Sequence, residues 1–338
     1  MNRLIIAATL AVFLLSSCAN EQHKNAELYG IEGYAQGTTF SIQYLDEKGR
    51  DFQQEIDSIL TAVDLSMSTW VDSSIISKIN HGPVGTYEID SIFKVVYLLS
   101  EEMHEETEGA FDATLAPVIY AWGIGFSNPQ KLSEQEVDSL LKYVGHDKFE
   151  VKNFLLTKKA AEAKLDFNGI AQGFSTDLIA EFLEERNVQN YMVEVGGEVR
   201  VRGKNSSGDF WRIGIDKPVG LEEERQVKAI VSLENQALAT SGNYRKFYEV
   251  DGEKFPHSID PANGFPVAHN LLSATVIAKT AAEADAIATA LMVKGVEESK
   301  QFLNRHQDLE AYLIFPDSSG GFSNYITPNL QKAIELLP

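Results

Sequence analysis

Residues 166–203 read DFNGIAQGFSTDLIAEFLEERNVQNYMVEVGGEVRVRG and join a glycine-containing turn to a helix and a strand. Apolar residues recur at helical spacing over 172–186, and a strand-like pattern follows over 191–202. A second segment, residues 257–295, also combines a glycine-containing turn with a strand and a helix. Each segment places carboxylates or hydroxyls where a helix begins. Together the two segments predict a nucleotide and metal site assembled from distant parts of the chain.

Patterns in the rest of the chain predict an α+β fold. Strand-like patterns cover 29–45 with Gly37-Thr38-Thr39 in the middle, 149–156, 211–216, 227–234, 271–278 and 309–315, and a hairpin is predicted over 244–258 with its turn at Asp251-Gly252. Further helices are predicted over 51–65 and 90–106, from Ser133, which forms a capping box with Glu136, and from Ala281. Hairpin-linked strands mixed with helices, without steady βαβ alternation, favour mixed, largely antiparallel sheets packed with helices over a doubly wound fold.

The chain of 338 residues is long enough to bury a substantial core. Its formal charge of -20 argues against nucleic-acid binding, because a phosphate backbone would be repelled. An acidic surface is compatible with recruiting cations such as Mg²⁺.

The N-terminus has the features of a bacterial lipoprotein signal. In residues 1–17, Arg3 precedes an apolar run that is short for a membrane span, and the run ends at Cys18, the only cysteine. We expect residues 1–17 to be a signal peptide, Cys18 to be lipidated, residues 18–27 to be a tether and 28–338 to be the folded domain. Several acyl chains on Cys18 would anchor the protein firmly. The alternative is an uncleaved anchor with an incidental cysteine.

Two oxygen-bearing side chains lie one turn apart on the helix predicted from Ala281. Thr280 and Glu283 form a capping box, which places Asp285 and Thr289 on one helical face. Such a pair suits a hard cation, which takes oxygen ligands from protein, phosphate and water. The alternative is structural: Asp285 would favour the positive end of the helix and Thr289 would bond a backbone carbonyl.

The segment 257–264, HSIDPANG, places an imidazole and a carboxylate beside a turn. His257 can move a proton at neutral pH or contact a phosphate. The alternative is that Asp260 only starts the turn and His257 is an ordinary strand residue.

Glycines in residues 166–173, DFNGIAQG, let the backbone approach a ligand and then open a helix, which favours phosphate oxygens. The segment is neither a Walker A loop nor G-x-G-x-x-G. Paired glycines alone also fit an ordinary tight turn, and Gly196-Gly197 fits a bulge in a strand.

Aromatic residues next to small polar ones occur in 109–114, GAFDAT, and in 67–70, MSTW. An isoalloxazine or adenine ring can stack on such side chains. Taken singly, each aromatic also fits core packing.

Taken together, these segments resemble the ApbE family, the FAD:protein FMN transferases, over essentially the whole mature chain. The motifs follow the family's order: Gly37-Thr38, Met67-Ser68-Thr69-Trp70 with Ser74 and Asn80, Gly109 to Thr114, the Asp166 loop, Gly196-Gly197, Thr240-Ser241-Gly242 with Tyr244-Arg245, His257 to Gly264, and Asp285 with Thr289. The resemblance implies an ApbE-like, T-fold-like architecture. It also implies transfer of the FMN moiety of FAD to a threonine or serine hydroxyl of a target protein through a phosphoester bond, with release of AMP.

The resemblance also implies roles for individual residues. It assigns Mg²⁺ to Asp285, Thr289 and the carbonyl of Gly169. It assigns FAD contacts to Trp70, which would face the flavin, and to Ala110, Phe111, Asp112, Asp166, Gln172 and Ile259. It makes His257 the candidate that helps the acceptor hydroxyl lose its proton, with Asp285 as the other catalytic residue. Trp70 stands where the family commonly has Tyr, and Gln172 where Lys or Glu is common, which puts the phenol and a charged FAD contact in doubt.

Partners and location follow from the same resemblance. The family commonly modifies extracytoplasmic flavoproteins, including subunits of membrane redox complexes. We therefore expect a lipid-anchored protein of the bacterial cell envelope, on the inner membrane facing the periplasm. Two other functions remain open: an FAD pyrophosphatase that yields FMN and AMP, and a non-catalytic flavin-binding lipoprotein.

Overall fold

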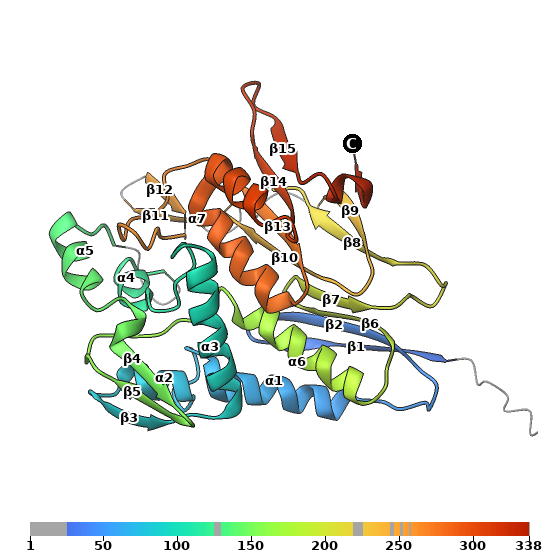
Figure 1. Cartoon of the computed structure of the whole chain (residues 1–338), viewed down its shortest axis with the longest axis horizontal. Helices are drawn as coiled ribbons and strands as arrows, with labels where there is room; N and C mark the ends of the chain where they lie inside the picture. Colours follow the sequence, from blue (N-terminus) through green and yellow to red (C-terminus); the bar gives the residue numbers. More distant parts are fainter. Residues whose placement is uncertain are drawn as a thin grey trace, which may run out of the picture.

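An eight-stranded antiparallel sheet organises the molecule (Figure 1). The computed structural model describes residues 26–124, 130–218, 226–243, 247–250, 253–256 and 258–337. The strand order is β1-β2-β6-β7-β10-β13-β14-β15. The bounds of these strands are β1 Glu27–Ala35, β2 Thr38–Asp46, β6 Asn190–Val195, β7 Glu198–Arg202, β10 Ala237–Gly242, β13 Ser273–Ala278, β14 Glu310–Pro316 and β15 Phe322–Ile326.

Three smaller sheets complete the strands, and every described strand pair is antiparallel. They are β3-β5-β4, β16-β9-β8 and the hairpin β11-β12. Their bounds are β3 Gly85–Glu88, β4 Phe149–Lys152, β5 Leu155–Lys158, β8 Trp211–Asp216, β9 Val227–Leu233, β11 Phe247–Val250, β12 Glu253–Pro256 and β16 Ile334–Leu336. The antiparallel, helix-packed α+β fold that the sequence predicts is confirmed.

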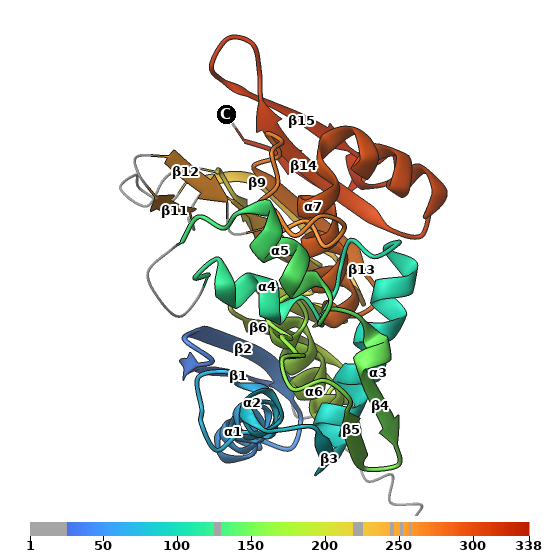
Figure 2. The same ribbon diagram turned by 90° about the vertical axis from the view of Figure 1, so that its left-hand side faces the viewer.

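Helices cover one face of the large sheet, as the two views of the ribbon show (Figures 1 and 2). The helices are α1 Gln53–Met67, α2 Ile75–His81, α3 Ser91–Glu106, α4 Ala116–Ala121, α5 Glu134–Leu141, α6 Ala171–Glu185 and α7 Ala281–Arg305. Helix α6 packs on β6 and β7, α7 packs on β10 and β13, and the two helices contact each other. In the described part of the chain, no helix combines the length and the apolar character needed to cross a membrane.

Alternating strand residues bury both faces of the large sheet. In β13, Val276 belongs to the core cluster that includes α7, whereas Ile277 belongs to a cluster shared with β8 and β9. The second cluster shows that the β16-β9-β8 sheet packs on the face opposite the helices. The central strands are therefore held from two sides, and they give α7 a rigid base.

Three segments predicted as single strand-like stretches are hairpins, and the first of them, residues 29–45, falls in β1 and β2. Residues 149–156 contain β4 and the start of β5, because Asn153 adopts φ 56° and reverses the chain. Residues 191–202 fall in β6 and β7, and Gly196-Gly197 forms the turn between them rather than a bulge. Both glycines have positive φ, 69° and 111°, a conformation that side-chain-bearing residues rarely adopt.

Candidate functional site

The start of α6 lies directly against the start of α7. A Cβ added to Gly173 would lie 2.3 Å from the carbonyl oxygen of Ala281, so only glycine permits this approach. The two segments that the sequence singled out therefore meet in space, as predicted.

A buried carboxylate of α6 caps α7. Asp177 Oδ1 accepts the backbone N–H of Ala281 at 2.9 Å, and Oδ2 accepts that of Ala282 at 2.9 Å. Thr280 accepts the N–H of Glu283 at 3.3 Å, as the predicted N-cap. Arg200 Nη1 from β7 donates to Asp177 Oδ1 at 2.9 Å. These contacts satisfy the free N–H groups of the first turn and fix the helix that carries Asp285 and Thr289.

Asp285 and Thr289 both face the loop that leads into α6. The N–H of Gly173 donates to Asp285 Oδ2 at 3.2 Å, the carboxylate's single hydrogen bond within the described residues. A Cβ on Gly169 would lie 3.1 Å from Thr289 Oγ1, and Ser241 Oγ of β10 lies 3.4 Å from the same oxygen. The structure thus gathers the three predicted metal ligands.

This donor set fits Mg²⁺ by its chemistry. The carboxylate of Asp285, the hydroxyl of Thr289 and the backbone at Gly169 offer oxygen atoms, which hard cations prefer. Asp285 is only 5% exposed and has a single N–H to offset its charge. A carboxylate in that setting requires either a proton or a cation. No hydrogen bond from Thr289 to a backbone carbonyl occurs in the described part of the chain, so the structural alternative for Thr289 has no support there.

The protonation of Asp285 gives a pH-dependent prediction. Burial raises the pKa of Asp285 from 3.8 to about 7, with a smaller raising effect from Asp177 and an opposing one from the Gly173 N–H. In metal-free protein the folded state therefore holds a proton that the unfolded chain releases near pH 4. Between these values the folded state binds more protons, so the free energy of unfolding falls as pH rises from about 4 to about 7 and levels off above 7.

We expect the melting temperature of metal-free protein to fall more steeply from about pH 5 to about pH 7 in the wild type than in Asp285→Asn. Other carboxyls with raised pKa that do not interact with Asp285, such as Glu310, contribute the same slope to both proteins. The difference between the two slopes thus reports Asp285 together with its mutual effect on Asp177. If calorimetric scans give equal slopes of melting temperature against pH for the two proteins, the raised pKa of Asp285 is contradicted.

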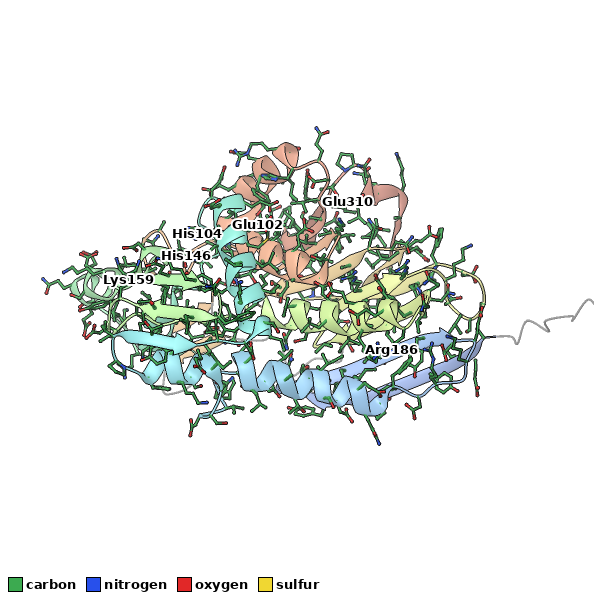
Figure 3. The ribbon with its side chains drawn as sticks, turned by 60° about the horizontal axis from the view of Figure 1, so that its bottom comes forward. Glu102, His104, His146, Lys159, Arg186 and Glu310 are labelled. Carbon is green, nitrogen blue, oxygen red and sulfur yellow. The ribbon has the colours of Figure 1, made fainter. Side chains whose placement is uncertain are left out.

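The loop 109–114 connects this site to a pair of histidines. Phe111 is buried, and a ring carbon lies 3.3 Å from the Cβ position of Gly169. Asp112 Oδ1 accepts from the Thr114 N–H at 2.7 Å, and its carboxylate lies beside His104 and His146, which Figure 3 labels next to each other. Burial lowers the pKa of His146, although Asp112 acts in the opposite direction.

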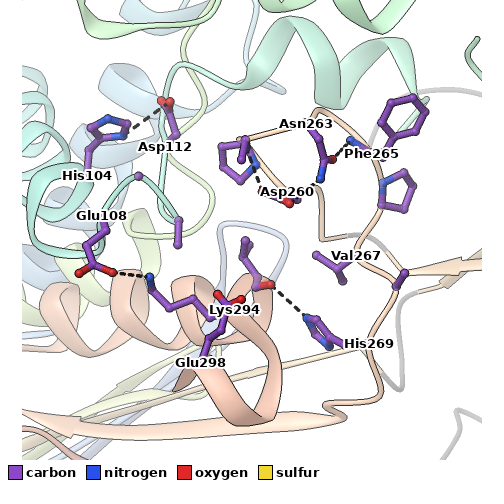
Figure 4. A pocket seen from close by; sticks show the side chains of 17 residues that line it. His104, Glu108, Asp112, Asp260, Asn263, Phe265, Val267, His269, Lys294 and Glu298 are labelled. Atoms are coloured by element: carbon purple, nitrogen blue, oxygen red, sulfur yellow. Dashed lines mark hydrogen bonds and ion pairs between the residues drawn. The ribbon is translucent and has the colours of Figure 1, made fainter. Parts of the chain in front are cut away.

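A cavity of about 1050 Å³ opens beside this loop (Figure 4). Ala110 and Asp112 line one side, and the turn from Asp260 to Asn263 lines the other. Ile259 is buried next to that turn, where it packs in a cluster with Trp122. Trp122 also holds the turn, because its indole N–H donates to the Gly264 carbonyl at 2.8 Å. The cavity therefore joins two of the segments expected to contact FAD.

Asp166, an expected FAD contact, is half-buried and lies near the buried hydroxyl of Tyr120. Burial raises the pKa of Asp166, and Asp166 in turn helps raise the pKa of the buried Tyr120 hydroxyl, which neighbours the Thr69 hydroxyl. Trp70, next to Thr69, is 64% exposed. An aromatic side chain with this exposure can present a ring face to a ligand.

Gln172 contacts the hairpin turn rather than the metal-ligand group. Its Nε2 lies 2.6 Å from the Cβ position of Gly196, where the Cγ2 of Thr38 is also close.

Side chains of residues 244–257 and the structure of residues 1–25 lie outside the described residues. The assignments of His257 and Cys18 therefore remain predictions.

Sequence reasoning missed residues that position the site. Asp177 and Arg200 were given no role, and Ser241 was noted only within a motif. The elements α2, α4 and β10 were also not predicted. The motif Thr240-Ser241-Gly242 was the available signal for β10, because β10 places the Ser241 hydroxyl near Thr289.

Comparisons with known proteins identify the family of the chain. The family model described as "ApbE family" matches residues 36–313. The chain is 36% identical to the FAD:protein FMN transferase of Haemophilus influenzae, covering 94% of each chain, and 32% identical to that of Vibrio cholerae, covering 96% and 97%. Among solved structures, the flavin transferase ApbE of Vibrio cholerae matches with a TM-score of 0.80 at 31% identity over 91% of this chain and 99% of its own. The flavinyl transferase ApbE of Pseudomonas stutzeri matches with a TM-score of 0.82 at 28% identity, over 91% and 97%.

Proposed function

Because the chain belongs to the ApbE family, we propose that it transfers the FMN moiety of FAD to a threonine or serine hydroxyl of a target protein. The acceptor oxygen forms a bond to the FMN phosphorus, the bond from that phosphorus to the AMP oxygen breaks, and the acceptor's proton leaves. The product is a phosphoester-linked flavin, and AMP is released. The observation that carries this proposal is that Asp285 and Thr289 of α7 lie against the loop and first turn of α6, at Gly173 and Gly169.

Transfer at a pyrophosphate depends on positioning and on neutralising charge. Asp285, Thr289 and the Gly169 carbonyl would hold Mg²⁺, which when bound neutralises negative charge on the phosphates. The Gly173 N–H orients the Asp285 carboxylate, and Asp177 holds the helix beneath it. His257 remains our candidate for accepting the proton of the acceptor hydroxyl.

The cavity supplies the room for FAD. Ala110 and Asp112 line it, and their chain neighbour Phe111 and Ile259, which precedes Asp260, are buried next to it. Asp166 and Trp70 are expected FAD contacts that do not line this cavity. The burial of Phe111 and Ile259 makes them supports of the pocket wall. The exposed ring of Trp70 is the side chain that we assign to stacking on the flavin.

The decisive experiment incubates the purified protein with FAD, Mg²⁺ and a target domain that carries an acceptor threonine. Flavin that stays on the denatured target supports transfer. Free FMN without labelled target would instead indicate an FAD pyrophosphatase, and unchanged FAD a flavin-binding protein without turnover. The matched control is the same target with its acceptor threonine replaced by alanine, which should remain unlabelled.

We also propose that Cys18 anchors the protein to the bacterial cell envelope by a lipid, with the folded domain facing the periplasm at the inner membrane. Targets would then be extracytoplasmic flavoproteins, such as subunits of membrane redox complexes. Residues 15–18, Leu-Ser-Ser-Cys, support this proposal, because they end the apolar segment and resemble the lipobox, the lipidation motif of bacterial lipoproteins.

The Cys18→Ser variant tests the anchor. We expect cells fed a labelled fatty acid to label the wild type and not the variant, because serine has no thiol to accept the lipid. The variant should also leave the membrane fraction. Continued lipid labelling of Cys18→Ser would contradict the assignment.

A further inference from the structure

Two histidines and an aspartate from three separate elements converge beside the cavity. His104 comes from the end of α3, Asp112 from the loop before α4 and His146 from a 3₁₀ turn, residues His146–Lys148. One potential ligand atom from each lies within 4.8 Å of the others. Asp112 lies between the two imidazoles, with Oδ2 at 3.6 Å from His104 Nδ1 and Oδ1 at 3.8 Å from His146 Nε2.

His146 has no hydrogen-bond partner for either ring nitrogen among the described residues, although both atoms are buried. Buried polar atoms in folded proteins are nearly always satisfied, by protein, water or an ion. Glu101 Oε1 lies 3.7 Å from His146 Nδ1, beyond hydrogen-bond range. A buried imidazole with two free nitrogens in acidic surroundings therefore points to a ligand that accepts electron pairs.

The other two side chains are already oriented by their own contacts. Thr114 donates to Asp112 Oδ1 through its N–H at 2.7 Å and through its hydroxyl at 2.6 Å. The Phe111 carbonyl accepts a hydrogen bond from His104 Nδ1 at 3.1 Å, so Nδ1 carries the proton and Nε2 is the His104 nitrogen left to bind a cation. Outer contacts of this kind, from a hydroxyl and a backbone carbonyl, are typical supports of metal ligands.

We propose that His104, Asp112 and His146 form a second cation site, which takes a transition metal of the Zn²⁺ class and is separate from the Asp285 group. Two imidazoles and one carboxylate suit such a metal, whereas Mg²⁺ favours oxygen ligands alone. Ligand atoms about 2.0–2.1 Å from a Zn²⁺ ion lie roughly 3.3 Å apart, so a separation of up to 4.8 Å between ligand atoms needs to shorten by up to about 1.5 Å. His104 and Asp112 line the cavity, so a fourth position faces the space assigned to FAD (Figure 4).

Titration of metal-free protein with Co²⁺ tests this site, because Co²⁺ replaces Zn²⁺ and its absorption reports imidazole coordination. We expect the wild type to bind one Co²⁺ with such a spectrum, even in excess Mg²⁺. His146→Asn and His104→Asn should each weaken this binding by at least about 100-fold, since removing even a supporting residue costs up to that much. Absence of the spectrum in the wild type, or unchanged affinity in both variants, overturns the proposal.

Two control variants distinguish Co²⁺ bound at the second cation site from Co²⁺ bound elsewhere on the protein. His81→Asn removes an exposed histidine outside the cluster and should leave Co²⁺ affinity unchanged. Asp285→Asn should also leave it unchanged, and a loss there would assign the metal to the Asp285 group and overturn the proposal. If His146→Asn does not fold, the wild-type protein alone still tests whether the cation binds at the cluster. Bound Co²⁺ must protect His104, which is 33% exposed, from diethyl pyrocarbonate, and unprotected His104 contradicts the site.

Discussion

Replacing Asp285 with asparagine lowers the rate of flavin transfer by at least about 100-fold, the upper range seen when even supporting residues of metal sites are removed. Asparagine keeps the size of the side chain and can still accept the Gly173 N–H with its amide oxygen. It loses the negative charge that balances a divalent cation at a site that is 5% exposed. The measurement is the single-turnover rate of flavin attachment as a function of Mg²⁺ concentration.

The control for this prediction lies on the same helix. Glu297 of α7 is exposed and pairs with Lys300, so Glu297→Gln removes a carboxylate without touching the Gly169 loop. We expect its transfer rate and Mg²⁺ dependence to match the wild type. A wild-type rate in Asp285→Asn would remove this residue from both its metal and its catalytic assignment.

The parts of the site that depend on local sequence were predictable. Helices α6 and α7 follow from apolar periodicity, and the start of α7 follows from Thr280, whose side chain accepts a backbone N–H three residues on. Because helical spacing is fixed, Asp285 and Thr289 had to share a face. Their common orientation toward the Gly169 loop was expected only from the family resemblance.

Contacts between residues far apart in the sequence could not be predicted from local patterns. Gly196-Gly197 fits a bulge or a turn equally well, and only the pairing of β2 with β6 and of β6 with β7 decides between them. Asp177 looks like an ordinary polar residue within a helix, since the N–H groups that it accepts are 104 and 105 positions away. His104 and His146 share no motif, because separate elements bring them together only in the folded chain.

Replacing Asp177 with alanine should destabilise the protein by about 3–5 kcal/mol, the usual cost of removing one partner of a buried ion pair. The change leaves the Ala281 and Ala282 N–H groups without acceptors and removes the closer carboxylate from Arg200, whose side chain is 16% exposed. Glu184 still pairs with Arg200 at 3.2 Å, which keeps the loss within that range. Urea unfolding at constant pH measures the change.

A suitable control is Glu185→Ala on the same helix, because the Glu185 side chain is 74% exposed and its nearest cation, Arg186, lies 3.9 Å away. Such exposed pairs contribute at most about 1 kcal/mol, so the unfolding midpoint should hardly change. Asp177→Ala should also weaken Mg²⁺-dependent transfer, because the cap fixes the start of the helix that carries Asp285. A loss of stability below about 1 kcal/mol would show that α7 does not depend on this cap.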